Sequence, residues 1–422
     1  MTEDTGTRET AERKEARNDD SDSERVDSYA KKAMVASVAG YAMDGFDLLI
    51  LGFSLAAISA TLQLSPGEAA SLASLTLWGA VTGGLVFGML SDYFGRVKLL
   101  AWSIIVFAVF TGLTAIAQDY TQISIFRFIA GIGLGAEFGI GMTLAAEAWP
   151  ARLRARATSY VALGWQSGVL AAALLSPIII NAWGWRALFA IGAIPAIFAF
   201  VYRRKLAEPK MFLDHGAAKK GEKFPLRLLF KDGPTSRASA AMLVLTSVQN
   251  FGYYGIMIWL PSYLSQEFGF SLTKSGTWVA VTVLGMAFGI FMFGIIADRI
   301  GRRPAFWLFQ TGAIVTVLAY SQLSTPITLL IGGAIMGMFV NGMLGGYGAL
   351  MAELYPTAAR ATAQNVLFNI GRGVGGFGPV WIAILATNYG FSTAIALLSG
   401  IYVFAMLAMF LIPEKRGQEL PA

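Results

Sequence analysis

The sequence Gly88-Met-Leu-Ser-Asp92-Tyr-Phe-Gly95-Arg96 recurs later in the chain as Gly294-Ile-Ile-Ala-Asp298-Arg-Ile-Gly301-Arg302. The two copies are 206 residues apart, counted from position 92 to position 298. A second pair has the same spacing: Glu147-Ala-Trp-Pro150-Ala-Arg-Leu-Arg154 and Glu353-Leu-Tyr-Pro356-Thr-Ala-Ala-Arg360. One spacing shared by separate motifs indicates two homologous halves that arose by duplication.

The composition predicts that both halves lie in a membrane. Of the 422 residues, 55% are hydrophobic and 14% are charged, whereas soluble domains carry about 25% charged residues. Apolar runs of about 20 residues, long enough to cross a bilayer as a helix, alternate with short charged clusters. The 47 glycines suit close packing of membrane helices. We therefore expect an all-α polytopic membrane protein.

The apolar runs predict twelve transmembrane helices, six in each half. Their expected positions are residues 33–60, 71–91, 98–118, 121–147, 156–180, 185–203, 239–265, 274–297, 304–322, 326–353, 360–386 and 390–412.

These helices define the expected domain organisation. Residues 1–32 are charged and polar, which predicts a disordered tail, and no apolar segment there resembles a signal peptide. Two six-helix bundles are expected over 33–203 and 239–412, with a polar, basic linker at 204–238 and a second tail at 413–422.

Basic residues predict the orientation in the membrane. One side carries the N-terminal tail, Arg96, Lys98, Arg152, Arg154, Arg156, the segment 203–237, Arg299, Arg302, Arg303, Lys415 and Arg416. The opposite side has only Arg186 and Lys274. By the positive-inside rule, the basic loops and both termini are cytoplasmic and the chain spans the plasma (inner) membrane. The net charge of +6 therefore does not predict nucleic-acid binding.

The residue inventory argues against several other functions. The chain has no cysteine, which excludes disulfides and thiolate chemistry, and its one histidine, His215, lies in a polar segment. A lone imidazole without partners does not make a metal site. We expect no metal, no cofactor and no catalytic nucleophile–base set, so the protein is not predicted to be an enzyme.

Four motifs resemble the major facilitator superfamily. The sequences GMLSDYFGRVK (88–98) and GIIADRIGRRP (294–304) look like its loop 2–3 and loop 8–9 signatures. Arg127-Phe-Ile-Ala-Gly131-Ile-Gly133-Leu-Gly135 resembles its fourth-helix motif, and Pro413-Glu414-Lys-Arg-Gly417-Gln-Glu419-Leu420 resembles its motif after helix twelve. The resemblance covers the whole chain. It implies two pseudo-symmetric six-helix bundles and transport by alternating access.

The loop motifs predict a gate at the cytoplasmic side. Asp92 is positioned to pair with Arg96 and to face the positive N-terminal end of a neighbouring helix. Such a contact between halves would hold the cytoplasmic side shut; the alternative is an ion pair that only tightens the loop. The residues expected to act in gating or conformational change are Asp92, Gly95, Arg96, Glu147, Asp298, Arg302 and Glu353.

Ionisable residues inside the predicted helices are few, and each is a functional candidate because burying a charge in lipid is costly. Asp44 and Asp47, three residues apart, share one face of helix one. Arg127 and Glu137 lie on helix four, and Arg372 lies on helix eleven. At about 1.5 Å rise per residue, Asp44, Glu137 and Arg372 lie at one level near the membrane midplane, where transporters of this fold bind substrate.

This arrangement suggests a division of labour. A carboxylate beside another in a low-dielectric site can exchange a proton near neutral pH, so Asp44, Asp47 and Glu137 are the proposed proton-coupling residues. Arg127 tunes or neutralises them. The planar fork of Arg372 suits a substrate carboxylate. The alternative is a permanent Arg127–Asp47 salt bridge, with only one carboxylate titrating.

A narrower resemblance supports an acidic substrate. Asp44-Gly-Phe-Asp47, Asn369-Ile-Gly-Arg372-Gly-Val-Gly375-Gly376 and the segment from 251 to 261 resemble proton symporters for sialic acid and for aromatic acids. Gly135-Ala-Glu137-Phe-Gly139 and Glu147-Ala-Trp-Pro150 lean towards the sialic-acid branch. The resemblance implies uptake of an organic anion with protons. The choice among sialic, aromatic and short-chain acids stays open, and so does the stoichiometry.

Further polar residues stand at plausible cavity positions. They are Gln166, Asn250, Tyr253, Tyr254, Asn341 and Asn369, and Gln166 is the repeat equivalent of Arg372. Each could instead form a hydrogen bond between helices.

The alternative functions are a drug or metabolite–proton antiporter, an uncoupled facilitator, and a transporter-like sensor. Arg372 argues against a cationic drug because it would repel one. No segment resembles an appended signalling domain. We therefore expect proton-coupled symport by a chain that acts as a monomer in the lipid bilayer.

Overall fold

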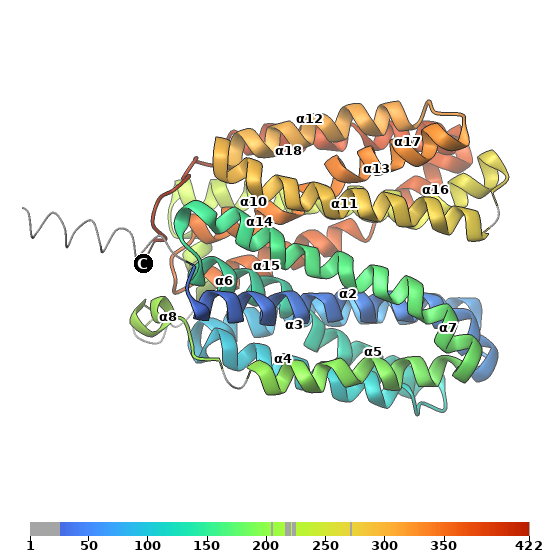
Figure 1. The fold of residues 1–422 in the computed structure, drawn as a ribbon, viewed down its shortest axis with the longest axis horizontal. Coiled ribbons are helices and arrows are strands. Elements are labelled where there is room, and N and C mark those ends of the chain that lie inside the picture. The colour runs from blue at the N-terminus through green and yellow to red at the C-terminus, as the bar shows by residue number, and fades with distance from the viewer. Residues whose placement is uncertain (1–25, 204–205, 216–220, 222–224, 271, 422) are drawn as a thin grey trace, which may run out of the picture.

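The computed structural model describes residues 26–203, 206–215, 221, 225–270 and 272–421, and these contain helices and no strand. Figure 1 shows two helical bundles side by side, the blue-to-green first half below and the yellow-to-red second half above. Helices of both bundles run along the long axis of the molecule.

The first half contains six helices and one 3₁₀ turn. They are α2 (Ser28–Leu62), α3 (Pro66–Phe94), α4 (Arg96–Thr114), α5 (Tyr120–Leu134), α6 (Glu137–Ala148), η1 (Ala151–Leu153) and α7 (Arg154–Arg203). The helices α5 and α6 together make one crossing. The long α7 makes two, because its backbone reverses at Gly184, where φ is 79° and ψ is 172°. A positive φ is readily adopted only by glycine.

The second half repeats this pattern. Its helices are α10 (Gly233–Phe268), α11 (Leu272–Ile300), α12 (Arg302–Tyr320), α13 (Pro326–Gly342), α14 (Leu344–Leu354), α15 (Arg360–Gly375), α16 (Gly378–Tyr389), α17 (Phe391–Leu398) and α18 (Ile401–Met409). The pairs α13–α14, α15–α16 and α17–α18 each make one crossing. The short α8 (Lys210–His215) and η2 (Pro225–Phe230) lie between the halves.

The structure is thus a twelve-helix membrane protein built from two pseudo-symmetric halves, as predicted. The helices α4 and α12 begin and end at positions 206 residues apart. Each follows a glycine with positive φ, Gly95 at 110° and Gly301 at 104°. The turn at Gly184 likewise has its equivalent at Gly390, where φ is 81°.

Three helices begin at least five residues earlier than the hydropathy predicts; one is α3, which starts at Pro66 rather than 71, after the N-cap Ser65. The helix α2 starts at Ser28 rather than 33, since Asp27 accepts a hydrogen bond of 2.6 Å from the backbone N–H of Ala30. The helix α10 starts at Gly233 rather than 239, and Asp232 accepts one of 2.8 Å from the N–H of Thr235. Aspartate caps satisfy N–H groups that would otherwise lack partners, so both helices extend into polar sequence. The expected N-terminal tail lies outside the described residues up to position 25.

Eight helical stretches within the described residues are long and apolar enough to cross a membrane. The other four crossings, which are the second part of α7, α10, α12 and α15–α16, are not among them, and Ile178–Ile194 of α7 forms a shorter apolar helix. Large apolar side chains cover the outside of the molecule; Trp78, Ile178 and Phe404 are each more than 60% exposed. An apolar outer surface of this kind fits contact with lipid.

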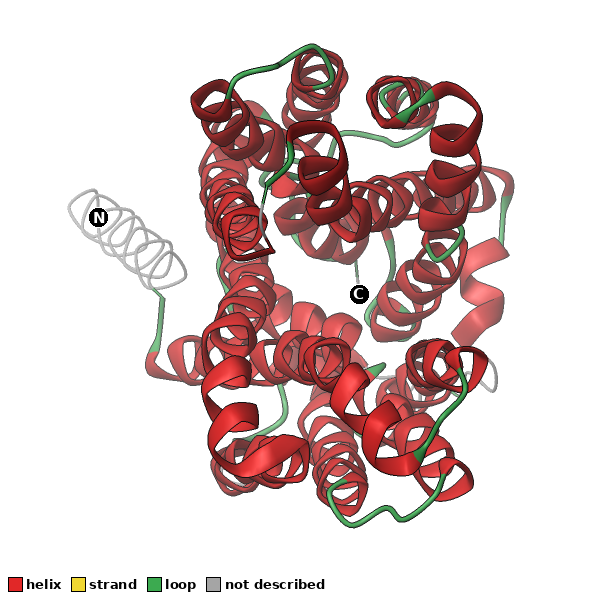
Figure 2. Cartoon of the chain, turned by 90° about the vertical axis from the view of Figure 1, so that its right-hand side faces the viewer, coloured by secondary structure: helices red, strands yellow, loops and turns green. Residues whose placement is uncertain are grey.

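The two bundles meet along a few helices. The helix α3 packs along α15, and α7 packs along α11 and α14. Figure 2, viewed down the long axis, shows the helices of both halves surrounding the middle of the molecule. We call the end where α3 ends and α4, α12 and α15 begin the basic end, after its arginines; the C-terminal segment also lies there (Figure 1).

Candidate functional site

A buried network of charged residues joins the two bundles at the basic end. Asp92, on α3, lies 2.9 Å from Arg96 and accepts a hydrogen bond of 2.8 Å from the backbone N–H of Thr362 at the start of α15. Glu147, on α6, lies 2.6 Å from Arg360 and 3.4 Å from Arg96. Because α15 belongs to the second half, these contacts cross the interface and place a carboxylate at a helix N-terminus, where it is stabilised.

The second half contributes an equivalent network. Asp298, on α11, lies 3.0 Å from Arg302 and accepts a hydrogen bond of 3.1 Å from the backbone N–H of Arg156, near the start of α7. Glu353 lies 2.7 Å from Arg302 and 3.2 Å from Arg154. The two networks are related by the repeat. Together they tie the bundles to each other at the basic end.

Two further carboxylates complete the networks. Glu208 accepts hydrogen bonds of 2.8 to 3.2 Å from three successive backbone N–H groups, residues 96–98, directly after Gly95. Glu414 does the same for the N–H groups of residues 302–303. Burial raises the pKa of the Glu208 carboxyl above its usual value, and the three N–H groups oppose that shift. Sequence analysis missed both caps, although their spacing of 206 residues could have revealed them.

Nearer the middle of the first bundle, Arg127 and Asp47 form a buried ion pair. Arg127 Nη1 lies 2.9 Å from Asp47 Oδ2, and the hydroxyl of Thr111 donates to Asp47 Oδ1 at 3.1 Å. The Arg127 guanidinium also donates to the hydroxyls of Thr111 and Thr114, each at 3.0 Å. All of these groups are buried. The structure thus contains the Arg127–Asp47 salt bridge that the sequence analysis gave as the alternative.

Asp44 and Glu137 occupy different surroundings. Asp44 is 1% exposed and interacts electrostatically with Arg372 and Tyr254, which lie across the interface. Glu137 begins α6, is 3% exposed, and accepts a hydrogen bond of 3.1 Å from the hydroxyl of Ser103. The two aspartates of α2 thus face different partners, although they are only three residues apart.

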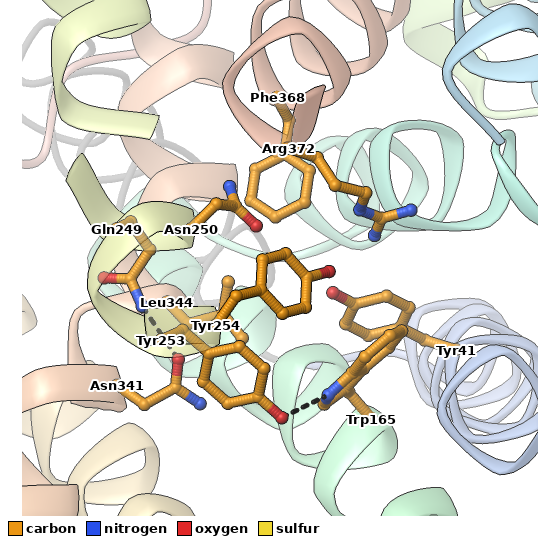
Figure 3. Close-up of a pocket in the computed structure, with 10 residues that line it drawn as sticks. All are labelled: Tyr41, Trp165, Gln249, Asn250, Tyr253, Tyr254, Asn341, Leu344, Phe368 and Arg372. Carbon is orange, nitrogen blue, oxygen red and sulfur yellow. Dashed lines mark hydrogen bonds between the residues drawn. The ribbon is translucent and has the colours of Figure 1, made fainter. Parts of the chain in front are cut away.

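A pocket lies between the bundles on the side of the networks away from the basic end. Figure 3 shows the ten residues that line it: Tyr41, Trp165, Gln249, Asn250, Tyr253, Tyr254, Asn341, Leu344, Phe368 and Arg372. They come from α2 and α7 in the first half and from α10, α13, α14 and α15 in the second. The space they surround is about 290 Å³, part of it open to solvent.

One end of the pocket is cationic and aromatic. The Arg372 guanidinium lies 5.7 Å from the ring centroid of Trp165 and 5.4 Å from that of Phe368. Arg372 is 4% exposed, and its Nε has no hydrogen-bond partner. Phe368 stacks on Phe138 of the other half with 3.5 Å between ring centroids. This stack joins the two halves next to the pocket.

The other end of the pocket is neutral and polar. Gln249 Nε2 donates to Asn341 Oδ1 at 2.8 Å, which leaves Gln249 Oε1 and Asn341 Nδ2 without partners (Figure 3). Both residues are 2% exposed. Beside them, Trp165 Nε1 donates to the Tyr253 hydroxyl at 3.4 Å, which links the two halves. At this end the pocket therefore offers an acceptor and a donor that a ligand or water can bond.

The structure brings most of the expected binding residues together. Arg372, Asn250, Tyr253, Tyr254 and Asn341 all line the pocket.

Two expected ligands lie elsewhere. Asn369 donates to the backbone oxygens of Gly135 and Asn365, at 3.3 and 2.9 Å, and so belongs to the interface between the bundles. Gln166 is 2% exposed and does not line the pocket.

The pocket also contains residues that sequence analysis did not single out: Tyr41, Trp165, Gln249, Leu344 and Phe368. Four of them are apolar or aromatic and cannot be told from ordinary helix-packing residues by type. Gln249 could have been found, because it directly precedes Asn250, which the sequence analysis did single out.

Comparisons with known proteins agree with this architecture. The model of the Major Facilitator Superfamily matches residues 38–326 and 242–422. A putative metabolite transport protein of Haemophilus influenzae is 61% identical over 94% of this chain and 99% of its own length. A probable 4-methylmuconolactone transporter of Cupriavidus pinatubonensis is 34% identical over 92% of this chain and 91% of its own.

The fold is also that of a solved transporter. The structure of the proton:xylose symporter XylE has a TM-score of 0.79 with this chain at 18% sequence identity, covering 94% of this chain and 98% of XylE. The repeat, the paired networks, the pocket between the bundles and the family match thus agree, and the chain belongs to the major facilitator superfamily as a transporter of metabolites, not an enzyme.

Proposed function

We propose that this protein takes up an organic carboxylate together with protons across the plasma (inner) membrane, with the basic end and both termini in the cytoplasm. The observation that carries the proposal is Arg372: a buried guanidinium, one of whose nitrogens has no partner, in a pocket between the two halves. A buried cation of this kind is costly without a compensating anion, a part that Asp44 and a substrate carboxylate can each play. The pocket lies within one chain, which supports a monomeric transporter.

The pocket favours a compact acid with a planar group. A guanidinium binds a carboxylate through two parallel hydrogen bonds, and aromatic side chains stack on flat or unsaturated groups. The walls formed by Tyr41, Trp165, Tyr254 and Phe368 provide such surfaces. The relative named as a 4-methylmuconolactone transporter supports a small ring-bearing substrate over a large sugar acid.

Asp44 is the proposed proton carrier that couples to the substrate. It interacts electrostatically with Arg372, so Asp44 and a bound carboxylate compete for the same positive charge. Binding of the anion to Arg372 therefore favours protonation of Asp44, and each substrate enters with a proton. Asp47 is neutralised by Arg127 and is assigned a supporting role, while Glu137 remains a second candidate carrier.

Transport follows from rocking of the two bundles. The charged networks and the Phe138–Phe368 stack join the two bundles, which supports a state closed between the pocket and the basic end. Breaking these contacts, with closure of the opposite end, would expose the same pocket to the cytoplasm.

Uptake into proteoliposomes tests this function. We would measure entry of radiolabelled aromatic, short-chain and sialic acids for the wild type, Arg372→Gln and Arg372→Lys. Each would be assayed with and without a pH gradient in which the outside solution is the more acidic. We expect gradient-stimulated uptake of a compact ring-bearing acid. Arg372→Gln should abolish it, and Arg372→Lys should raise KM because lysine keeps the charge but loses the planar fork.

Other outcomes would point elsewhere. Uptake that does not respond to the gradient would indicate a facilitator. Uptake driven by a pH gradient with the more acidic solution inside would indicate an antiporter. Failure of every acid to enter, or full activity of Arg372→Gln, would overturn the carboxylate assignment.

A further inference from the structure

The C-terminal segment, residues 413–421, turns back across the basic end after α18. Figure 1 shows this dark red segment running along the left-hand end of the molecule towards the middle. Glu414 caps α12, as described above, and Lys415 Nζ donates to the backbone oxygen of Glu353 at 3.1 Å. Arg416 Nε donates to the backbone oxygen of Asp298 at 3.1 Å. Up to this point the segment contacts its own half.

Beyond Gly417 the segment reaches the other half. Arg154, the first residue of α7, donates to the backbone oxygen of Gln418 at 3.2 Å while also bonding Glu353. Leu420 is 8% exposed and packs in a small apolar cluster with Ala146 of α6 and Ala352 of α14. Thus a side chain that is covalently part of the second half is buried between the two halves.

The last described residue closes the contact. The backbone oxygen of Pro421 accepts a hydrogen bond of 2.8 Å from Arg360 and one of 3.2 Å from the backbone N–H of Thr357. Arg360 is the same residue that pairs with Glu147 across the interface, and Met211 of α8 packs against the Leu420 cluster. The segment is therefore integrated into the gate network rather than lying loosely over it.

We propose that residues 418–421 act as a strap that stabilises the state closed at the basic end. The site of Leu420 exists only while α6 and α14 are together, because Ala146 and Ala352 lie in different halves. Opening the basic end would split this site and expose Leu420. A group that binds one conformation shifts the equilibrium by its differential affinity, so the strap favours the closed state. The inference rests on the proposed rocking of the bundles but not on any particular substrate.

The strap can be tested by thiol labelling, because the chain has no cysteine of its own. Ser159→Cys would introduce one thiol in a fully buried position between the halves, against Gly294 and Gly345. We would measure its maleimide labelling rate with an intact tail, with residues 418–422 deleted, and with Leu420→Ser. We expect both changes to increase the rate several-fold, and Glu419→Gln, at an exposed neighbouring position, to leave it unchanged.

Two controls separate the strap from other causes. Asp92→Asn breaks the gate network itself and must accelerate labelling; if it does not, the proposed rocking fails, not only the strap. The second control adds Ala146→Cys and Leu420→Cys to the Ser159→Cys protein and joins them by oxidation to a disulfide. The labelling rate of Ser159→Cys should then fall below the rate with an intact tail. General loosening of the fold would not produce that decrease. Labelling that rises with Asp92→Asn but is unaffected by the tail changes would overturn the inference.

Discussion

At the scale of single residues, the two aspartates of α2 illustrate how position decides the role of a charge. Asp47 is held by Arg127 and by the hydroxyl of Thr111, whereas Asp44 interacts electrostatically with Arg372. We expect Asp44→Asn to abolish accumulation driven by the pH gradient but to retain exchange of substrate across the membrane, because exchange requires no release of the proton. Parallel assays of uphill uptake and counterflow measure the two activities.

The neighbouring carboxylate provides the contrast. Asp47→Asn leaves the buried Arg127 without its counter-charge, and removing one partner of a buried pair costs about 3–5 kcal/mol. We expect a clearly lower Tm for Asp47→Asn and little change in Tm for Asp44→Asn. Gradient-driven accumulation by Asp44→Asn would show that another carboxylate carries the proton.

The amide pair at the neutral end of the pocket leads to a second prediction. Gln249 Oε1 and Asn341 Nδ2 offer an acceptor and a donor to a hydroxyl or similar group on the substrate. We expect Asn341→Leu to raise KM about tenfold for a hydroxylated acid, the loss of roughly one hydrogen bond to a buried partner, and to change KM little for the unsubstituted acid. Equal effects on both acids would indicate that the pair only packs the helices.

Some residues of the candidate site could be predicted from the sequence and others could not. Arg127, Arg372 and the acidic residues could be identified because a charge in an apolar helix is conspicuous, and their types indicated carboxylate and proton chemistry. Trp165 and Phe368 could not, because an aromatic residue that lines a pocket has the same sequence pattern as one that packs a helix. Asn369 was assigned to the pocket from its helix and depth, but its rotation about α15 places it against α3 and α5.

At the scale of secondary-structure elements, α3 and α15 approach each other closely, and we expect this contact to belong to the state closed at the basic end. A Cβ added at Gly84 would collide with the side-chain amide of Asn369, from the other half. We expect Gly84→Ala to disfavour the state closed at the basic end and to speed labelling of Ser159→Cys. Gly52→Ala, where a Cβ meets nothing within 4 Å, is the matched control and should leave labelling unchanged.

A slower or unchanged labelling rate in Gly84→Ala would mean that the α3–α15 contact persists in both states. Helix positions themselves were largely predictable, since the apolar runs and the repeat together indicate twelve crossings. The starts of α2 and α10 were not, because hydropathy does not register the aspartate caps at positions 27 and 232. The breaks between α5 and α6 and between α13 and α14 were not predictable either, because the sequence stays apolar across them.

At the scale of the whole molecule, the duplicated sequence produces two equivalent charged networks, but the proposed anion-binding arginine stands in the second half alone. Gln166 is the repeat equivalent of Arg372, so corresponding positions of the two halves carry a neutral and a charged side chain. This asymmetry is consistent with a single anion bound on the second half and the proton-binding carboxylates on the first. Substrate binding and protonation are then coupled across the same interface that opens and closes.

That division predicts how transport responds to the membrane potential. A monoanion that enters with one proton moves no net charge, whereas entry with two protons moves one charge and gains about 2.3 kcal/mol per 100 mV. Asp44 is the carboxylate that interacts with Arg372, and Asp47 is neutralised by Arg127, so we expect one proton for each monoanion. In proteoliposomes at equal pH on both sides, a potassium diffusion potential should therefore cause no accumulation. A pH gradient with the more acidic solution outside should cause accumulation. Accumulation driven by the potential alone would require a second proton carrier, and its loss in Glu137→Gln would identify that carrier as Glu137.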